Sequence, residues 1–123
     1  MEKGAMTELR DAGKFDITPQ GWGADYFDVS NMLSIFVGGN FINAGRYASE
    51  TYDSLYNQAL TTVDNAARIE LLHQAEKTLV VDDAGMIPLY HSNSTAIFRD
   101  DVCTNVSYNA NGKVVLTDVV VVK

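Results

Sequence analysis

The sequence predicts an α/β fold in which a helix hairpin packs on a small mixed sheet. Two stretches in the middle of the chain, 52–63 and 69–79, repeat apolar residues at helical spacing. Short runs with strand character lie before and after them, the last of which is rich in valine. A chain of 123 residues is long enough to bury one core, so these elements are expected to share it.

The composition excludes several classes of partner. Apolar residues make up 46% and charged residues 20%, as in ordinary soluble globular proteins. The net charge of −7 argues against binding to nucleic acid or to an anionic membrane surface. No apolar run reaches about 18 residues, and no signal peptide or lipobox is recognisable at the start. Cys103 is the one cysteine, so an internal disulfide is not expected.

The first half of the chain predicts short elements. A helical piece covers 5–10, and a strand is expected over 15–22 because apolar and polar residues alternate over 15–18. Pro19 cannot donate to a sheet ladder, so this strand should lie at an edge or contain a bulge. A helix over 30–37 follows, with Asp28 or Ser30 as its N-cap, and two glycines end it.

The helix hairpin is the strongest prediction. Its first helix presents one apolar face, made of Tyr52, Leu55, Tyr56, Ala59, Leu60 and Val63. The second presents Ile69, Leu72, Ala75 and Leu79. Ser49 and Asp64 are the expected N-caps, and the link over 61–65 is short enough for a hairpin.

The last third of the chain predicts β structure. Strands are expected over 86–91 and 96–98, although a proline interrupts the first of them. Asn111-Gly112 marks a hairpin turn, and β-branched runs follow over 114–116 and 119–122. Such a valine-rich end must pair with something, because free strand edges aggregate.

One octet, Gly21-Trp22-Gly23-Ala24-Asp25-Tyr26-Phe27-Asp28, stands at the expected end of the first strand, where open α/β sheets usually bind ligands. Together with Ser30 and Asn31 it resembles the Gly-Trp-x-x-Asp-Tyr-x-Asp-Pro-Ser-Asn pattern of family 5 extracellular solute-binding proteins, with Val29 in place of the proline. Segments 14–17, 47–53, 64–72 and 83–90 are similar to further motifs of that family, in the same order.

The resemblance implies a fold, a function and a location. Residues 1–100 would be part of the second lobe of a type II periplasmic-binding-protein-like fold, and 101–123 a β segment returning toward a first lobe that the chain does not contain. The longer protein would capture oligopeptides or dipeptides and deliver them to the permease subunits of an ABC importer, without catalysis, cofactor or metal. It would be extracellular or periplasmic, anchored through an N-terminal lipid. Without a covering lobe, the chain is expected to self-associate through its valine-rich edge.

The same resemblance implies the ligand-binding residues, namely Gly21, Trp22, Gly23, Asp25 and Asn43. A carboxylate at Asp25 suits the cationic amine of a peptide. Glycines expose backbone groups for pairing with an extended ligand, and an indole offers a tolerant pocket wall. Asn43 matches one of the paired asparagines in the family's loop.

Other interpretations stay open at this point. Trp22 could belong to the core, the glycines could relieve crowding at a bend, and Asp25 could be a turn former. A receptor for a non-peptide ligand such as nickel or a sugar fits the same family. Asp25 and Asp28 could also be the paired carboxylates of a small hydrolase. His73 and His91 lie in different predicted elements, and no third zinc ligand accompanies them.

Overall fold

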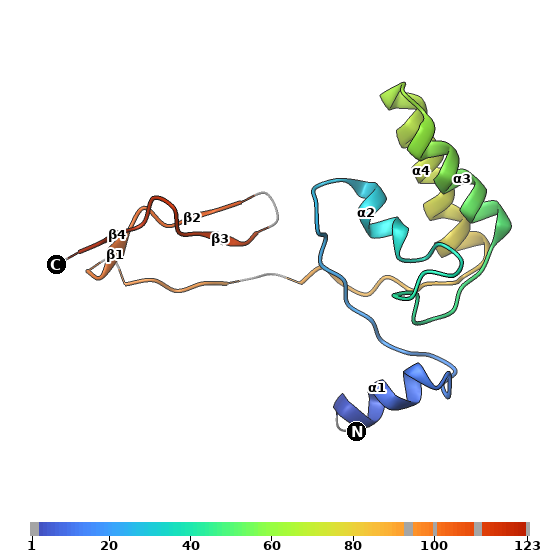
Figure 1. The fold of residues 1–123 in the computed structure, drawn as a ribbon, viewed down its shortest axis with the longest axis horizontal. Helices are drawn as coiled ribbons and strands as arrows, with labels where there is room; N and C mark the ends of the chain where they lie inside the picture. Colours follow the sequence, from blue (N-terminus) through green and yellow to red (C-terminus); the bar gives the residue numbers. More distant parts are fainter. Residues whose placement is uncertain (1–2, 93–94, 100, 110–111, 123) are drawn as a thin grey trace. The chain divides into compact units, whose positions relative to one another are not determined.

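The computed structural model describes residues 3–92, 95–99, 101–109 and 112–122 and divides the chain into two units. The first unit runs from Met1 to Pro88 and contains the helices, and the second runs from Leu89 to Lys123 and contains the strands (Figure 1). Each unit has its own internal contacts. The octet lies entirely within the first unit.

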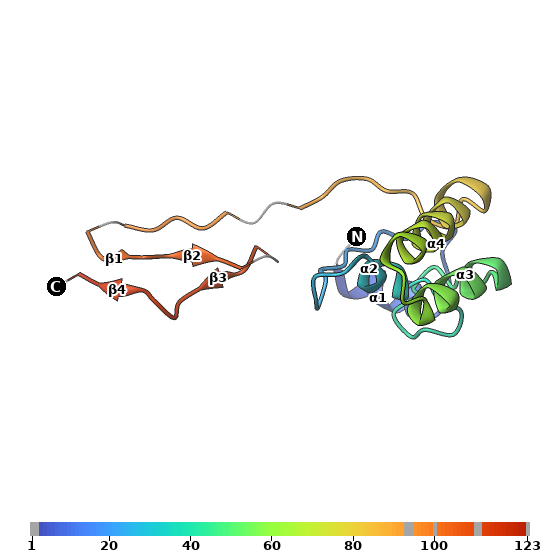
Figure 2. The ribbon, with the colours of Figure 1, turned by 90° about the horizontal axis from the view of Figure 1, so that it is seen from above.

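The predicted helix hairpin is confirmed. Helices α3 (Glu50–Thr61) and α4 (Asn65–Lys77) lie side by side, and a π-helical turn, η1 (Thr78–Asp82), extends α4 (Figures 1 and 2). Ser49 caps α3 by accepting a hydrogen bond from the Tyr52 amide. Asp64 caps α4 in the same way through the Ala67 amide. These caps satisfy backbone donors that a helix start leaves unpaired.

The core of the first unit lies between α3, α4 and the short helix α2 (Val29–Ser34). Its buried side chains are Leu33, Tyr52, Tyr56, Ala59, Leu72, Ala75 and Leu79. The apolar face predicted for α3 is wrong at its C-terminal end, since Leu60 is 53% and Val63 is 99% exposed. Val63 lies in the link between the helices, beyond the part of α3 that α2 and α4 cover.

Two tyrosine hydroxyls attach α2 to the hairpin. The Tyr52 hydroxyl donates to the Leu33 carbonyl at 2.6 Å, and the Tyr56 hydroxyl donates to the Ser30 carbonyl at 3.2 Å. Both bonds are buried. Helix α2 ends at Ser34, three residues before the predicted end, and the chain then turns so that the Gly38 amide donates to Asp53.

Helix α1 (Lys3–Asp11) confirms the first predicted helix, but the strand predicted over 15–22 is wrong. The described residues contain no strand there, nor over 86–91 or 96–98. A strand requires a ladder partner, and in the described chain none lies beside these segments. Pro19 and Pro88 also lack the N–H that a ladder uses.

The second unit contains two antiparallel pairs instead of the predicted small mixed sheet. Strand β1 (Cys103–Thr104) pairs with β4 (Val120–Val121), and β2 (Ser107–Tyr108) pairs with β3 (Val114–Val115). The predicted turn joins β2 to β3, with the Gly112 amide bonded to the Asn109 carbonyl; positions 110 and 111 lie outside the described residues. The valine-rich end therefore pairs within the chain.

A close approach of two segments in the first unit gives a test of the packing. A Cβ atom at Gly85 would lie 2.4 Å from Cδ2 of Tyr47. That ring cannot shift freely, because its hydroxyl donates to Asp83 at 2.6 Å and its edge packs on the Tyr52 ring. We expect Gly85→Ala to lower the free energy of unfolding by about 1–3 kcal/mol in denaturant titrations.

The matched control for this substitution is Gly45→Ala. No heavy atom of the described chain lies within 4 Å of a Cβ built at Gly45. This control should change the free energy of unfolding by less than about 0.5 kcal/mol. Equal effects of the two substitutions would contradict the packing of Tyr47 on Gly85.

Candidate ligand-binding site

The octet folds around one buried side chain, Asn31. The Trp22 indole Nε1–H donates to Asn31 Oδ1 at 3.2 Å, and the Asp25 backbone amide donates to the same oxygen at 3.1 Å. Asn31 lies in α2 and is only 4% exposed. The loop that contains Trp22 and Asp25 is thus fastened to the helix that follows it.

The predicted contact residues in the octet are accessible. Gly21, Gly23 and Asp25 are exposed, and Trp22 is half-buried and outside the core cluster. No heavy atom of the described residues lies within 4 Å of a Cβ built at either glycine, so crowding does not explain them. The octet therefore offers open backbone at its glycines, an exposed carboxylate and a half-buried indole.

Asp28 has a structural task in this arrangement. Its carboxylate caps α2 through the Ser30 amide at 2.8 Å and pairs with the Arg68 guanidinium of α4 at 2.5 Å. The hydrogen bonds from Ser30, and then the bond from Arg68, lower the pKa of Asp28 from 3.8 to about 2. A carboxylate with so low a pKa stays ionised at neutral pH and is a poor general acid.

Asn43 lies apart from the octet, in the loop after α2. Its side-chain amide donates to the Tyr47 carbonyl at 2.7 Å, and its oxygen accepts from the Tyr47 amide at 3.1 Å. A weaker bond reaches the Phe36 carbonyl. These bonds close the loop between α2 and α3, so the Asn43 amide is occupied by the chain itself.

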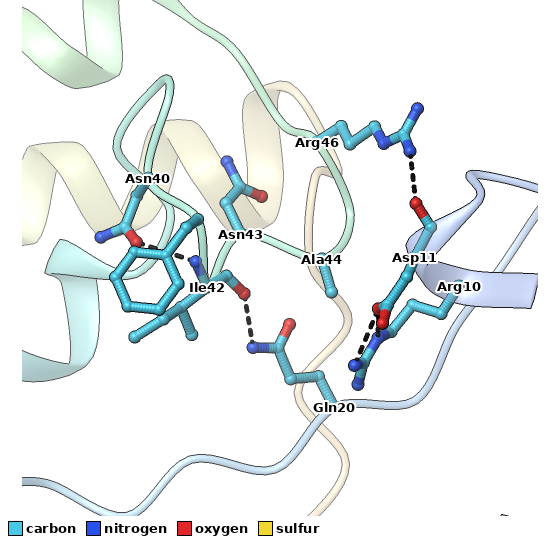
Figure 3. A pocket seen from close by; sticks show the side chains of 9 residues that line it. Arg10, Asp11, Gln20, Asn40, Ile42, Asn43, Ala44 and Arg46 are labelled. Carbon is cyan, nitrogen blue, oxygen red and sulfur yellow. Dashed lines mark hydrogen bonds and ion pairs between the residues drawn. The ribbon is translucent and has the colours of Figure 1, made fainter. Parts of the chain in front are cut away.

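An open pocket of about 570 Å³ lies beside this loop (Figure 3). It is lined by Arg10, Asp11, Gln20, Asn40, Phe41, Ile42, Asn43, Ala44 and Arg46. Gln20, which directly precedes the octet, donates to the Ile42 carbonyl at 2.9 Å, and Arg46 donates to the Asp11 carbonyl at 3.1 Å. Of the predicted contact residues, the pocket lining includes Asn43 and none from the octet.

Sequence reasoning missed the roles of Asn31 and Arg68. Asn31 was recognisable as the last position of the family pattern that begins at Gly21, but the spacing did not predict that its side chain bonds back to Trp22 and Asp25. Arg68 lies in α4 and bonds Asp28 across 40 positions of sequence. A long-range ion pair leaves no local signal.

Other site types find no support in the described part of the chain. No group of three histidine, cysteine, aspartate or glutamate side chains there could hold a metal ion. His73 and His91 are both exposed. None of the helices described combines the length and the apolar character that a bilayer crossing needs.

Curated proteins similar to this chain are binding proteins. A dipeptide-binding protein of Lactococcus lactis subsp. cremoris is 43% identical over 58 residues, which is 46% of this chain and 10% of that protein. The dipeptide-binding protein DppE of Bacillus subtilis is 35% identical over 80 residues, 65% of this chain and 15% of its own length. Part of this chain is homologous to family 5 peptide-binding proteins. The resemblance drawn from the motifs is confirmed to that extent.

The similarity also reaches receptors with other names. The probable deoxycholate-binding periplasmic protein YgiS of Escherichia coli is 36% identical over 76 residues, 62% of this chain and 14% of that protein. Periplasmic oligopeptide-binding proteins match as well. The chain thus spans a small part of each relative, and no family model matches it.

The ion pair at Asp28 predicts a pH-dependent stability. Because the folded pKa lies below the ordinary one, the stabilisation is complete above about pH 5 and is lost as the pH falls through 4 toward 2. Asp28→Asn keeps a capping residue but removes the charge. We expect it to lower the free energy of unfolding by about 1 kcal/mol at pH 7, since solvent screens a partly exposed pair.

The comparison variant is Asp82→Asn, which removes the more exposed Lys77–Asp82 pair. Its effect should stay below about 0.5 kcal/mol. Denaturant unfolding at pH 7, 4 and 2.5 measures both variants. A deficit in Asp28→Asn that persists unchanged at pH 2.5 would contradict the assigned role of the charge.

Proposed function

We propose that this chain forms part of the ligand-binding region of an extracellular or periplasmic substrate-binding protein, which captures oligopeptides or dipeptides for an ABC importer. The observation that carries the proposal is the homology to peptide-binding proteins together with the accessible octet. Residues 1–100 would belong to the second lobe of a type II fold, and 101–123 would return toward the first. The longer protein would be anchored by an N-terminal lipid and would meet the permease subunits.

Each octet residue has a proposed role. The exposed Asp25 carboxylate would bind the cationic amine of the peptide, which is a strong charge-assisted contact. Gly21 and Gly23 would pair their open backbone with an extended peptide and so bind it without reading its sequence. The half-buried Trp22 indole would form one wall of a side-chain pocket.

Asn43 would act on the ligand through the loop that it closes. Its side chain already bonds Tyr47 on both sides, and its backbone bonds Asn40 and Arg46, so this residue would contribute through its place in the pocket wall. The loop carries the exposed Phe41 and the guanidinium of Arg46 into the same pocket lining. These groups suit the apolar and anionic parts of a bound molecule.

A non-peptide ligand is the second candidate, because one relative is named as a deoxycholate-binding protein. Deoxycholate has no cationic amine, so its binding would not need the Asp25 carboxylate. The hydrolase interpretation is weaker, since Asp28 is ionised and engaged by Ser30 and Arg68. Asp25 would then lack the protonated partner that glycoside hydrolysis requires.

Substitution of Asp25 tests the peptide assignment. We would build a chimaera in which this chain replaces the matched segment of Bacillus subtilis DppE, and titrate it with trialanine by calorimetry. Asp25→Asn should weaken binding by about 1.5–3 kcal/mol, the contribution of a hydrogen bond to a charged group. N-acetylation of the peptide should cost a similar amount, and the two changes together should cost little more than either alone.

The matched control is Asp16→Asn, an exposed aspartate outside the octet, which should leave affinity unchanged. Equal affinity for free and acetylated trialanine would refute the role of Asp25. Tight binding of deoxycholate with no binding of trialanine would favour the second candidate.

The 123-residue chain alone should bind peptide no more tightly than about millimolar, because receptors of this kind close two lobes around their ligand. It should also self-associate through its strands, since Leu116 is 66% and Val121 is 69% exposed. Sedimentation velocity at low and high concentration measures this, and Val121→Lys should shift the chain toward monomer. A strict monomer that binds trialanine at micromolar concentration would overturn this expectation.

A further inference from the structure

The most specific polar contact near the octet involves Asn31, a residue with no assigned part in binding. A carbonyl oxygen has two lone pairs, and Asn31 Oδ1 uses them on two different donors, the Trp22 indole and the Asp25 amide. These are two of the residues proposed to contact the ligand. One atom therefore determines the spacing between the indole and the backbone that carries the carboxylate.

Helix α2, which carries Asn31, is itself attached to the hairpin at both ends. At its start, Asp28 pairs with Arg68 of α4. Further along, Ser30 and Leu33 offer carbonyls to the buried hydroxyls of Tyr56 and Tyr52. A helix of six residues would be unstable alone, so these contacts give α2 its fixed position.

The contacts form one continuous series from the core to the octet. The hairpin bonds to α2, and α2 carries Asn31. The Asn31 side chain then accepts hydrogen bonds from Trp22 and Asp25. Asn31 is 4% exposed and the two bonds to its oxygen are partly buried, which limits the competition from water. A binding group held in this way loses less conformational freedom when a ligand arrives.

We propose that Asn31 is a positioning residue, which holds the Trp22 indole and Asp25 in the arrangement with which they contact the ligand. This inference rests on the proposed function for its consequence in binding. The arrangement itself can be tested without a ligand, because Trp22 is the single tryptophan of the chain. Its indole N–H gives one resolved signal in a proton–nitrogen spectrum.

The first measurement uses the unmodified 123-residue chain. The Trp22 indole N–H should exchange with water more slowly than the indole of a free tryptophan peptide. In Asn31→Leu, which removes the acceptor at similar volume, the exchange should quicken about five- to tenfold and the signal should shift, as expected for the loss of a partly buried hydrogen bond. Asn31→Asp, which keeps an acceptor oxygen, should retain most of the protection.

The matched control is Asn57→Leu, at an exposed position of α3. It should leave the indole signal unchanged. If Asn31→Leu does not fold, the unmodified chain still tests the positioning role of Asn31. A Trp22 indole N–H that exchanges as fast as that of a free tryptophan peptide would overturn the inference. An Asn31→Leu indole identical to that of the parent would overturn it too.

The second measurement uses the chimaera with trialanine. Asn31→Leu should weaken binding about tenfold. The loss should shrink when Asp25 is already Asn or when the peptide is acetylated, because the contact between the Asp25 carboxylate and the peptide amine is then absent. Unchanged affinity despite an altered indole would refute the role in binding. A parent chimaera that binds no peptide would count against the proposed function, and the indole measurements would then decide the positioning alone.

Discussion

The first unit depends on the attachment of a six-residue helix to a hairpin by two tyrosine hydroxyls. Tyr52 and Tyr56 come from α3 and donate to carbonyls of α2, inside a core that excludes water. Their rings stack with centroids 6.5 Å apart, so one face of α3 supplies both apolar contact and hydrogen bonds. Burial raises the pKa of both phenols, which keeps them protonated as donors at any physiological pH.

Local signals predicted the helices well. The caps at Ser49 and Asp64 and the apolar spacing in α3 and α4 act within a few residues, and the structure reproduces them except at Leu60 and Val63. The strands were harder, because a strand depends on a partner elsewhere in the chain. Residues 15–18 alternate as a strand should, yet no ladder partner for the segment 15–22 exists in the described residues. Periodicity shows the suitability of a segment for pairing but not the presence of its partner.

In the candidate site too, features close in sequence were predictable, whereas contacts between distant residues were not. The octet was recognisable because its glycines, indole and carboxylate are close in sequence. The contact of Asn31 with Trp22 spans nine positions, and that of Arg68 with Asp28 spans 40. Spacing rules for helices and strands reach about four positions, so these contacts lie beyond them. The residues proposed to contact a ligand were therefore easier to pick out from the sequence than the long-range contacts that fix their positions.

Pro19 has a consequence for how an extended ligand could align with the segment before the octet. Proline has no backbone N–H, so a strand laid along this segment finds no donor at that position. Donors resume at Gln20 and continue through the two glycines. Pairing out of register toward the N-terminus would leave a ligand carbonyl without a partner, and such a group is costly once water is excluded. Under the proposed function, the proline would thus favour one alignment of an extended peptide over its neighbours, whatever the side chains of the peptide.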